Sequence, residues 1–379
     1  MRSRFLTARF LLACWLVLLL LVTTNSVHQV SIAYARGHGP ARADDSVSIS
    51  VFGLFRPREF VVTAPAGRAL ILQAGEQREV LENPGVSSAT IRSDGSNLVI
   101  SSGMRELHAT KVTVAGRRGD ESADFILEIP GKIKRQYHGT LDITPSSGNL
   151  LSVVTLDLET AVASVVAAES SADTPPEALK AQAIAARSYF VAGRGRHRNF
   201  DFCDTTHCQF LRAAPPATSR VAVAVGETRG VVLAYQSRLF APMYTRSCGG
   251  RTRTPAQVGL PTAAYPYFSV ECNRCRRHPV RWTSYIPAHQ AGSLRASDET
   301  ARLEVARQIG WSAVPSNDFS FAKDGDRVLL RGIGNGHGIG LCQAGARAMA
   351  ASGADFREIL LHYYPNIDIV SHSGPNRPE

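Results

Sequence analysis

The hydrophobic pattern of this chain changes its period once, and that change constrains the possible folds more than any other feature. Up to about residue 145, apolar and polar side chains alternate within short segments such as 47–51 and 111–114, or form a short apolar run at 96–101. Alternation with a period of two is typical of strands that bury one face. A final strand pattern at 137–143 then leads into helical periodicity. We therefore predict an α+β fold, in which a β-rich N-terminal module precedes a mixed α/β domain.

The first predicted helix carries an acidic residue on its apolar face. That face is formed by Leu158, Val162, Val165 and Val166. Glu169 falls on the same face, because it follows Val166 by three residues. Loss of hydration there would raise the pKa of its carboxyl group toward the range useful to a general acid. The alternative is a partly exposed glutamate at a helix end, or one paired with Lys180 or Arg187.

A second helix is predicted to begin with Thr174 as its N-cap and Pro175 at its first position, with Glu177 completing a capping box. Lys180 and Arg187 are seven residues apart and so lie nearly in line on one helix face. From there they could bind the acidic or acetamido groups of a polymer. The simpler interpretation is that these long side chains solvate a helix face.

A glycine-rich segment at 332–340 precedes a third helix, predicted from 341 to about 352. Its core is Gly-His-Gly-Ile-Gly, in which backbone NH groups and the imidazole of His337 could both face a ligand. Gln343, on the first turn of the helix, could donate a hydrogen bond to a sugar. A purely structural turn is equally consistent with this glycine pattern.

The N-terminus has the order of an export signal, with arginines followed by an apolar run at 10–22 and then small and polar residues. The apolar run is shorter than the roughly 20 residues of a comfortable membrane span. We therefore expect a leader over residues 1–43, cleaved near residue 35 or 43, and an exported protein of the cell envelope, periplasmic or extracellular.

Charge and missing signatures narrow the possible functions. The chain has a net charge of +10, and residues 1–43 hold five arginines and no acidic residue. The surplus of positive charge that remains after residue 43 suits binding to an anionic envelope polymer. It gives no indication of nucleic acid binding, because no basic stretch is interleaved with stacking aromatics. The chain also lacks a Gly-x-Ser-x-Gly elbow, a His-Glu-x-x-His pair and a phosphate loop.

The cysteines after the leader could hold metal or form disulfides. They are six in number: Cys203, Cys208, Cys248, Cys272, Cys275 and Cys342. An even count permits disulfides in an exported protein, including a tight Cys272–Cys275 bridge. Alternatively, His197, Cys203 and Cys208 lie within twelve positions and offer the mixed ligands that zinc accepts, with His207 or Cys248 as a possible further ligand. A Cys203–Cys208 disulfide would consume both thiols.

Five linked segments resemble the SpoIID/LytB family in content and order. They are Ala-Ala-Glu at 167–169, Glu-Ala-Leu-Lys-Ala-Gln-Ala-Ile-Ala-Ala-Arg-Ser-Tyr at 177–189, Cys-Asp-Thr-Thr-His-Cys-Gln at 203–209, Ser-Cys-Gly-Gly-Arg-Thr at 247–252, and Gly-His-Gly-Ile-Gly-Leu-Cys-Gln-Ala-Gly-Ala at 336–346 with His-Tyr-Tyr-Pro at 362–365. The chain then divides into a leader at 1–43, a β-rich module at 44–133, a SpoIID/LytB-like catalytic domain at 134–370 and a tail at 371–379.

The resemblance implies a lytic transglycosylase that acts on peptidoglycan glycan strands, as the sporulation member does on strands stripped of stem peptides. Its catalytic glutamate is matched by Glu169, although Ser170 and Ser171 stand where many members have Met-Pro. Some members bind zinc near the positions of His197, Cys203 and Cys208, which suggests a structural zinc here. The residues expected to bind substrate are Lys180, Arg187, Ser247, His337 and Gln343, of which Arg187, Ser247 and His337 are expected to converge on the Glu169 cleft.

In the implied reaction Glu169 protonates the bridging oxygen after N-acetylmuramic acid and then deprotonates the C6 hydroxyl of the same sugar, which gives a 1,6-anhydro product without a cofactor. A hydrolase would use a second carboxylate about 5 to 9.5 Å away. Asp201, Asp204 and Glu271 are the candidates for that group. The alternative function is a non-catalytic module that binds peptidoglycan and activates a cell-wall amidase, because LytB-type relatives are described as amidase modifiers.

Overall fold

The computed structural model describes residues 45–205, 207–261 and 263–372. The predicted leader at 1–43 and most of the predicted tail at 371–379 lie outside these residues. No helix in the described ranges is both long and apolar enough to cross a membrane.

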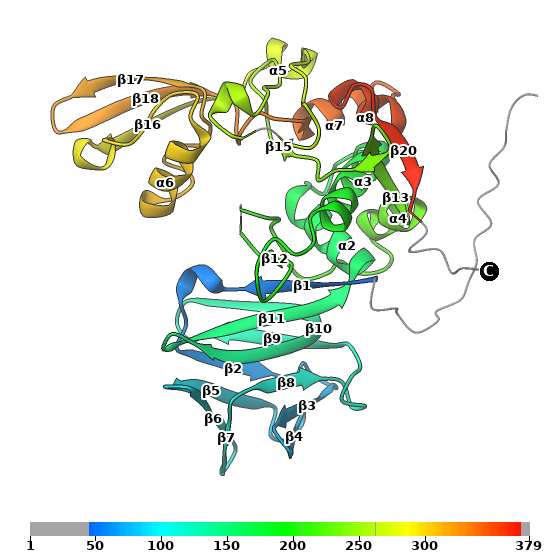
Figure 1. Ribbon diagram of the computed structural model, residues 1–379, viewed down its shortest axis with the longest axis vertical. Coiled ribbons are helices and arrows are strands. Elements are labelled where there is room, and N and C mark those ends of the chain that lie inside the picture. The colour runs from blue at the N-terminus through cyan, green and yellow to red at the C-terminus, as the bar shows by residue number, and fades with distance from the viewer. Residues whose placement is uncertain (1–44, 206, 262, 373–379) are drawn as a thin grey trace, which may run out of the picture. The chain divides into compact units, whose positions relative to one another are not determined.

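The N-terminal part of the described chain is built almost entirely of strands (Figure 1). These are β1 (Ser46–Val51), β2 (Glu59–Thr63), β3 (Ala69–Ala74), β4 (Gln77–Glu82), β5 (Ser88–Asp94), β6 (Asn97–Ser102), β7 (Arg105–Ala109), β8 (Val112–Ala115), β9 (Ala123–Ile129), β10 (Ile133–Ser146) and β11 (Asn149–Asp157). The main order of the sheet is β12-β1-β11-β10-β9-β2-β5-β6-β7, with β8, β3 and β4 branching from β10. The segments predicted at 47–51, 96–101 and 111–114 are confirmed as β1, β6 and β8.

The long strand β10 changes partner at a glycine. Its first half pairs antiparallel with β9 as far as Gly139, and its second half pairs with β11 from Thr140 onward. Gly139 has φ +146°, and a Cβ at this position would lie 2.3 Å from the carbonyl oxygen of Thr155. Only glycine fits this conformation and this close approach of two backbones. The prediction that this strand is the last before the helices is wrong, because β11 follows it.

The helices α2 (Leu158–Glu169), α3 (Pro176–Ala192) and α4 (Arg220–Glu227) come next, and α7 (Gln343–Ala351) and α8 (Phe356–Tyr363) pack on α3 from the C-terminal part of the chain (Figure 1). The short strands around them are β12 (Phe202–Cys203), β13 (Val231–Tyr235), β14 (Arg238–Leu239), β15 (Tyr244–Thr245), β19 (Leu341–Cys342) and β20 (Asp368–Ser371). A further short helix is α5 (Asn273–Arg277). The observed mixture of strands and helices confirms the predicted α+β class.

A separate small sheet is formed by the part of the chain between α5 and α7. It has the order β16 (Arg281–Pro287), β18 (Arg327–Ile333) and β17 (Phe319–Asp324), all antiparallel. Helix α6 (Glu299–Ile309) belongs to the same part of the chain, and its Val305 joins Ile286 and Leu330 in a separate small hydrophobic cluster. The hydrophobic pattern of the sequence gave no sign of this unit, because β17 exposes most of its side chains.

The start of α3 differs from the prediction. The helix begins at Pro176, with Pro175 as its N-cap and no side-chain capping bond. The hydroxyl of Thr174 instead lies 3.1 Å from that of Ser171. Glu177 forms no capping box, because its carboxylate accepts hydrogen bonds from Lys180 and from the backbone N–H of Phe356. The predicted capping box is therefore wrong, and the cap is a proline whose φ already suits a helix start.

One hydrophobic core joins the strands to the first helices. It includes Phe125 and Leu141 from the sheet, Val162 from α2 and Ala183 from α3. The predicted domain boundary between residues 133 and 134 falls at the start of β10. The β-rich part before it and the helices after it contribute to the same hydrophobic core. A second core contains buried residues of α3, α7 and α8 together with four cysteines.

Candidate active site

Glu169 is the last residue of α2 and lines a cavity of about 290 Å³. The helix starts where Asp157 accepts a hydrogen bond from the backbone N–H of Thr160, and it ends with Ser170 as its C-cap. The other lining residues are Ala168, Ser170, Ser171, Thr174, Ala178, Gln182, Arg246, Ser247, Val280, Asn335, Leu341, Gln343, Ala344, Ala346 and Arg347. Segments far apart in sequence therefore meet around the Glu169 carboxyl group.

The surroundings of Glu169 favour its protonated form. Burial raises the pKa of its carboxyl group above the ordinary value, because a charged carboxylate loses hydration there. A hydrogen bond of 3.4 Å from Gln343 Nε2 to Glu169 Oε2, together with the positive charges of Arg246 and Arg212, opposes this rise only in part. The arrangement can hold a proton and can also stabilise the carboxylate that remains after the proton leaves.

Gln182 on α3 contributes a polar group that the sequence analysis did not single out. Its side chain is 3% exposed and lines the cavity, and its Oε1 accepts a 3.5 Å hydrogen bond from Gln343 Nε2. Its own Nε2 has no hydrogen-bond partner among the described residues. A buried donor without an acceptor costs about 1–3 kcal/mol, which a ligand oxygen could recover. The sequence feature that could have indicated Gln182 is its position as a single amide side chain among the alanines of α3.

Ser247 and Gln343 line the Glu169 cavity, and their roles in binding stay predictions. The backbone of Ser247 pairs with that of Asn335 through N–O distances of 3.0 and 2.8 Å. Its hydroxyl lies 3.4 Å from Cys275 Sγ. Ser247 therefore offers the cavity mainly a firmly positioned backbone, whereas Gln343 reaches Glu169 with its side chain.

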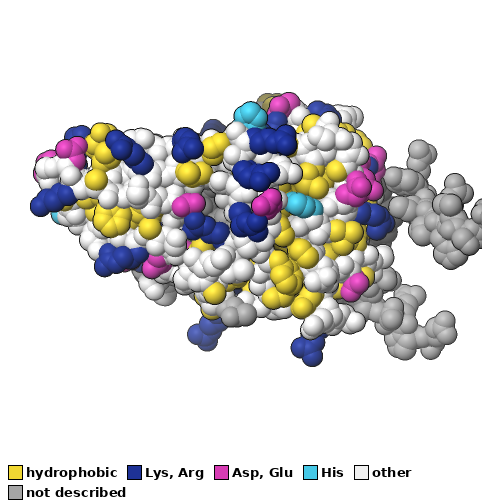
Figure 2. All heavy atoms as spheres, turned by 90° about the horizontal axis from the view of Figure 1, so that it is seen from above, with side chains coloured by type: hydrophobic (Ala, Val, Ile, Leu, Met, Phe, Trp, Pro, Cys, Tyr) yellow, Lys and Arg dark blue, Asp and Glu magenta, His cyan; other side chains and the backbone are white. Residues whose placement is uncertain are grey.

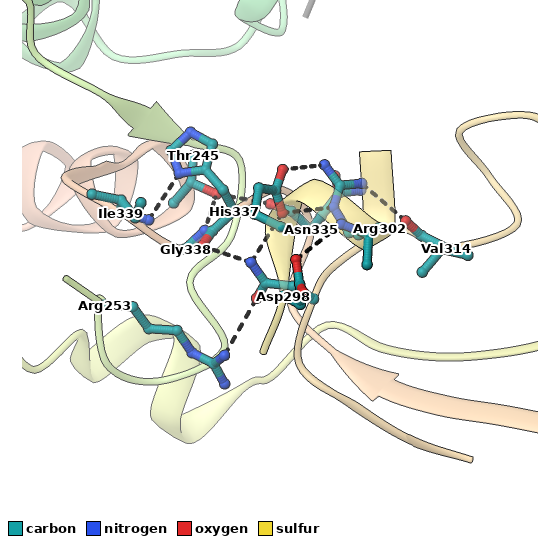
Figure 3. Close-up of polar contacts among 12 residues, drawn as sticks. Thr245, Arg253, Asp298, Arg302, Val314, Asn335, His337, Gly338 and Ile339 are labelled. Atoms are coloured by element: carbon teal, nitrogen blue, oxygen red, sulfur yellow. Dashed lines mark hydrogen bonds and ion pairs between the residues drawn. The ribbon is translucent and has the colours of Figure 1, made fainter. Parts of the chain in front are cut away.

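His337 belongs to the loop beside the cavity, but it is not among the residues that line it. Its Nδ1 accepts a 3.0 Å hydrogen bond from the backbone N–H of Ile339, as Figure 3 shows. The N–H of Gly338 donates to Thr245 Oγ1 at 3.1 Å, and the carbonyl of His337 accepts from Asn317. Burial lowers the pKa of the imidazole, so the ring favours its neutral form. Its predicted convergence on Glu169 therefore stays a prediction, and its described contacts support the fold of the loop.

Arg187 is a structural residue. Its side chain is 1% exposed, and its Nε and Nη2 donate to the two carboxylate oxygens of Glu159 at 2.8 and 2.6 Å. Further bonds of 3.2 Å reach the carbonyl oxygens of Val225 and Val231. The prediction that Arg187 binds substrate in the Glu169 cleft is wrong, because its donors are used inside the protein to join α2, α3, α4 and β13.

Lys180 is likewise committed to partners on the protein. Its Nζ lies 2.7 Å from Glu177 and 2.9 Å from Glu227, and it does not line the Glu169 cavity. The observed basic side chains of the cavity are instead Arg246 and Arg347. Arg347 also joins the cavity rim to the α2–α3 connection through bonds to Ser171 and Asp173 of 2.6 Å each.

The three acidic residues considered for a second catalytic carboxylate lie elsewhere. Asp201 accepts hydrogen bonds from the backbone and hydroxyl of Ser48, and Asp204 accepts from the N–H of Phe52. Glu271 forms an exposed ion pair with Arg251. Among the described residues that line the cavity, Glu169 is the one carboxylate.

The predicted zinc ligands lie together. The ligand atoms of His197, Cys203, His207 and Cys208 are all within 4.8 Å of one another. His197 Nε2 lies 3.4 Å from Cys208 Sγ, and His207 Nδ1 lies 3.8 and 3.4 Å from the two sulfurs. Both thiols are free in this structure. Two sulfurs and two imidazole nitrogens at this spacing fit a tetrahedral zinc ion, with His207 as the fourth ligand.

Comparisons with known proteins find one matching family and several similar proteins. The family described as Stage II sporulation protein matches residues 146–235. An uncharacterized protein of Brachyspira hyodysenteriae is 30% identical over 277 residues, which are 64% of this chain and 74% of the relative. Stage II sporulation protein D of Bacillus amyloliquefaciens is 27% identical over 294 residues, 66% of this chain and 85% of the relative.

A further relative has a different name. The protein of Bacillus subtilis named amidase enhancer is 24% identical over 288 residues, which are 55% of this chain and 40% of the relative. Stage II sporulation protein D of the same species is 25% identical over 264 residues, which are 76% of that relative. The matched segment and these relatives establish that the chain belongs to the stage II sporulation protein D (SpoIID) family.

Proposed function

We propose that this chain is an exported peptidoglycan lytic transglycosylase with Glu169 as its general acid and base. The observation that carries the proposal is a carboxyl group of raised pKa that lines a cavity beside the buried amide of Gln182 and the half-buried amide of Gln343. Cleavage of a glycosidic bond requires a proton donor at the leaving oxygen, and a carboxyl group whose pKa is raised above its ordinary value holds such a proton more readily than a solvated one.

In the proposed mechanism, Glu169 donates its proton to the bridging oxygen after an N-acetylmuramic acid residue, and the bond from that oxygen to C1 breaks. The sugar passes through an oxocarbenium-like state. The Glu169 carboxylate then removes the proton from the C6 hydroxyl of the same sugar, whose oxygen bonds to C1. The proton returns to Glu169, and a 1,6-anhydro ring forms without added water. Gln343 stabilises the transient carboxylate through its hydrogen bond to Oε2.

The cavity offers complementary groups for an acetylated sugar. The free Nε2 of Gln182 can donate to a carbonyl or hydroxyl oxygen, and Arg246 and Arg347 place positive charge at the rim. More Lys and Arg than Asp and Glu side chains are visible on the face shown in Figure 2. An anionic polymer is attracted to such a surface. The substrate we propose is the glycan strand, including strands stripped of stem peptides.

The products test this proposal. The purified chain, without a partner protein, is incubated with intact and with stripped glycan strands, and the fragments are analysed by mass spectrometry. We expect muramic ends that lack one water molecule relative to a hydrolysed end. Hydrolysed ends would show that a water molecule attacks C1 and would overturn the intramolecular step while leaving the acid role of Glu169 intact.

A second candidate function is the activation of a cell-wall amidase without glycan cleavage. The relative named amidase enhancer favours it. The same partner-free assay separates the two functions, because an activator releases no fragments on its own. An activator would instead increase the rate at which an added amidase removes stem peptides, and Glu169→Gln would leave that increase unchanged.

We also propose that His197, Cys203, His207 and Cys208 bind a structural zinc ion. Support comes from their two sulfur and two nitrogen donors within 4.8 Å and from the free state of both thiols. Zinc would fix the loop that follows β12, which is anchored to β1 through the Ile49–Phe202 and Ser50–Cys203 pairs. The proposed chemistry at Glu169 does not require this ion.

A further inference from the structure

Four cysteines far apart in sequence meet in the second hydrophobic core. The Sγ atoms of Cys248, Cys272, Cys275 and Cys342 all lie within 4.8 Å of one another. All four residues are buried, with exposed fractions of 6% or less. They come from the segment after β15, from the residue before α5, from α5 itself and from β19. All four are free thiols.

The sulfur spacing corresponds to ligands around a metal ion. Cys275 Sγ and Cys342 Sγ are 3.5 Å apart, whereas a disulfide bond is about 2.05 Å long. Four thiolates bound to tetrahedral zinc at about 2.3 Å are separated from one another by roughly 3.8 Å, which follows from the tetrahedral angle. A simple pair of buried thiols would not require two further sulfurs within the same few ångströms.

Hydrogen-bond donors surround these sulfurs. The backbone N–H of Cys248 lies 3.4 Å from Cys342 Sγ, the hydroxyl of Tyr363 donates to Cys272 Sγ at 3.4 Å, and the Ser247 hydroxyl lies 3.4 Å from Cys275 Sγ. Donors around a metal centre orient its ligands and offset the charge of bound thiolates. Three of the four sulfurs thus have a polar neighbour in an otherwise apolar core.

Gly345 of α7 leaves room for the contact between the Tyr363 hydroxyl and Cys272 Sγ. A Cβ at Gly345 would lie 2.6 Å from Cys272 Sγ and 1.8 Å from the Tyr363 hydroxyl oxygen. Any larger side chain would therefore separate Tyr363 from the sulfur to which it donates. Glycine in the interior of a helix costs roughly 0.5–1 kcal/mol relative to alanine, so a close approach is the physical reason to have it here.

We propose that Cys248, Cys272, Cys275 and Cys342 form a tetrathiolate site for a structural zinc ion, separate from the site at residues 197–208. Four thiols release their protons to solvent and bind one Zn²⁺ ion, with no change of oxidation state. Cys-x-x-Cys at 272–275 supplies the paired ligands that such sites commonly use, and the other two ligands close the shell, as in a structural rather than a catalytic zinc site.

This ion would fix two walls of the Glu169 cavity. Cys248 directly follows Ser247, and Cys342 directly precedes Gln343, and both neighbours line the cavity. The metal would therefore hold the Ser247 segment and the first turn of α7 at a constant separation. The site itself does not depend on the proposed glycan chemistry, and its test uses no substrate.

The test uses Cys203→Ser/Cys208→Ser, which removes two ligands of the other zinc site and leaves these four cysteines unchanged. After purification without chelators, we expect about one zinc ion per chain with four sulfur neighbours at about 2.3 Å by X-ray absorption spectroscopy. The matched variant Cys272→Ser/Cys275→Ser should lose this all-sulfur signal. A metal-free chain, or a bound zinc with nitrogen or oxygen neighbours, would overturn the proposal.

A second measurement needs no substitution and covers the case in which a variant fails to fold. Peptide mapping of the unmodified chain under non-reducing conditions detects any bridge among the four cysteines. Zinc binding predicts four cysteines that become alkylated after unfolding in the presence of a chelator. A Cys272–Cys275 bridge, a Cys248–Cys342 bridge or any other disulfide within this set would instead show that the cluster is oxidised and holds no metal.

Discussion

At the scale of single residues, the behaviour of Glu169 follows from its position at the end of α2. Its carboxyl group is desolvated, yet it has a hydrogen-bond donor in Gln343 and cationic neighbours in Arg246 and Arg212. Desolvation favours the acid, and the other three groups favour the carboxylate. A group that must alternate between both forms requires this balance, which a fully solvated or fully ion-paired glutamate would not provide.

Glu169→Gln should abolish most of the glycan cleavage while the strand still binds. The amide is nearly isosteric but cannot donate the acid proton, and loss of general acid catalysis typically lowers turnover on the order of 100-fold to 10,000-fold. Fragment release and strand binding are measured on the same preparations. Glu271→Gln is the matched control, because Glu271 is exposed and lies outside the cavity lining. Wild-type turnover in Glu169→Gln would refute the assignment.

The same residue predicts a pH dependence of stability. The folded pKa of Glu169 is raised, so the folded state binds this proton more tightly than the unfolded state does. Stability from this group is therefore present at low pH and is lost as pH rises from the unfolded value, about 4.3, through the folded value. Glu169→Gln is neutral at every pH and escapes this loss.

Thermal unfolding from acidic to neutral pH measures this effect. We expect the Tm of Glu169→Gln, relative to wild type, to increase as pH rises and to be least favourable in acid. A difference between Glu169→Gln and wild type that is constant with pH would mean that the Glu169 carboxyl group is solvated in the folded protein.

At the scale of elements, the packing of α2 against α3 depends on one buried ion pair. Arg187 forms two bonds with Glu159 and two more with backbone carbonyl groups. Removal of one partner leaves an uncompensated buried charge, so Arg187→Met should lower the free energy of unfolding by about 3–5 kcal/mol. The double variant Arg187→Met/Glu159→Gln should recover part of this loss. Chemical denaturation measures both, and a change below 1 kcal/mol in Arg187→Met, as expected for an exposed pair, would contradict this account.

Arg187 also illustrates what helical spacing can and cannot predict. The spacing correctly placed Lys180 and Arg187 on α3, but it did not reveal which elements cover that side of the helix. Glu159 lies 28 residues away in sequence, so its contact with Arg187 is determined by tertiary packing. The same limit applies to Gln182, whose importance follows from the segments that enclose it.

Among the secondary-structure elements, too, some features were predictable from the sequence and others were not. Strands β1 and β8 were predictable because their alternation reflects one buried face, and β6 was predictable from a short apolar run. The α3 cap was not, since Thr174 had an equally good partner in Ser171 and Pro175 could serve as the N-cap itself. The bond of the His337 ring was not predictable for a related reason: the glycines around it allow the ring to bond to its own loop at Ile339.

At the scale of the whole molecule, the loop at residues 197–208 lies between the large sheet and the helices. Cys203 pairs with Ser50 of β1, and the adjacent Gln209 donates to the carbonyl of Ala186 in α3 and accepts from Tyr244. Tyr244 precedes the segment that lines the Glu169 cavity. This loop therefore joins the two main structural layers near the cavity without entering it.

Loss of the zinc ion proposed for this loop should lower stability before it affects catalysis. Cys203→Ser/Cys208→Ser removes both thiolate ligands, so we expect a lower Tm and a smaller further decrease on addition of a chelator than in the wild type. Turnover should stay near the wild-type value at temperatures well below the new Tm, because Glu169 and the substrate hydroxyl carry the reaction. Thermal unfolding, zinc content and fragment release are measured on the same preparations. If turnover falls in a variant whose fold remains intact at the assay temperature, the ion participates in the reaction, and the chemistry proposed for Glu169 alone is incomplete.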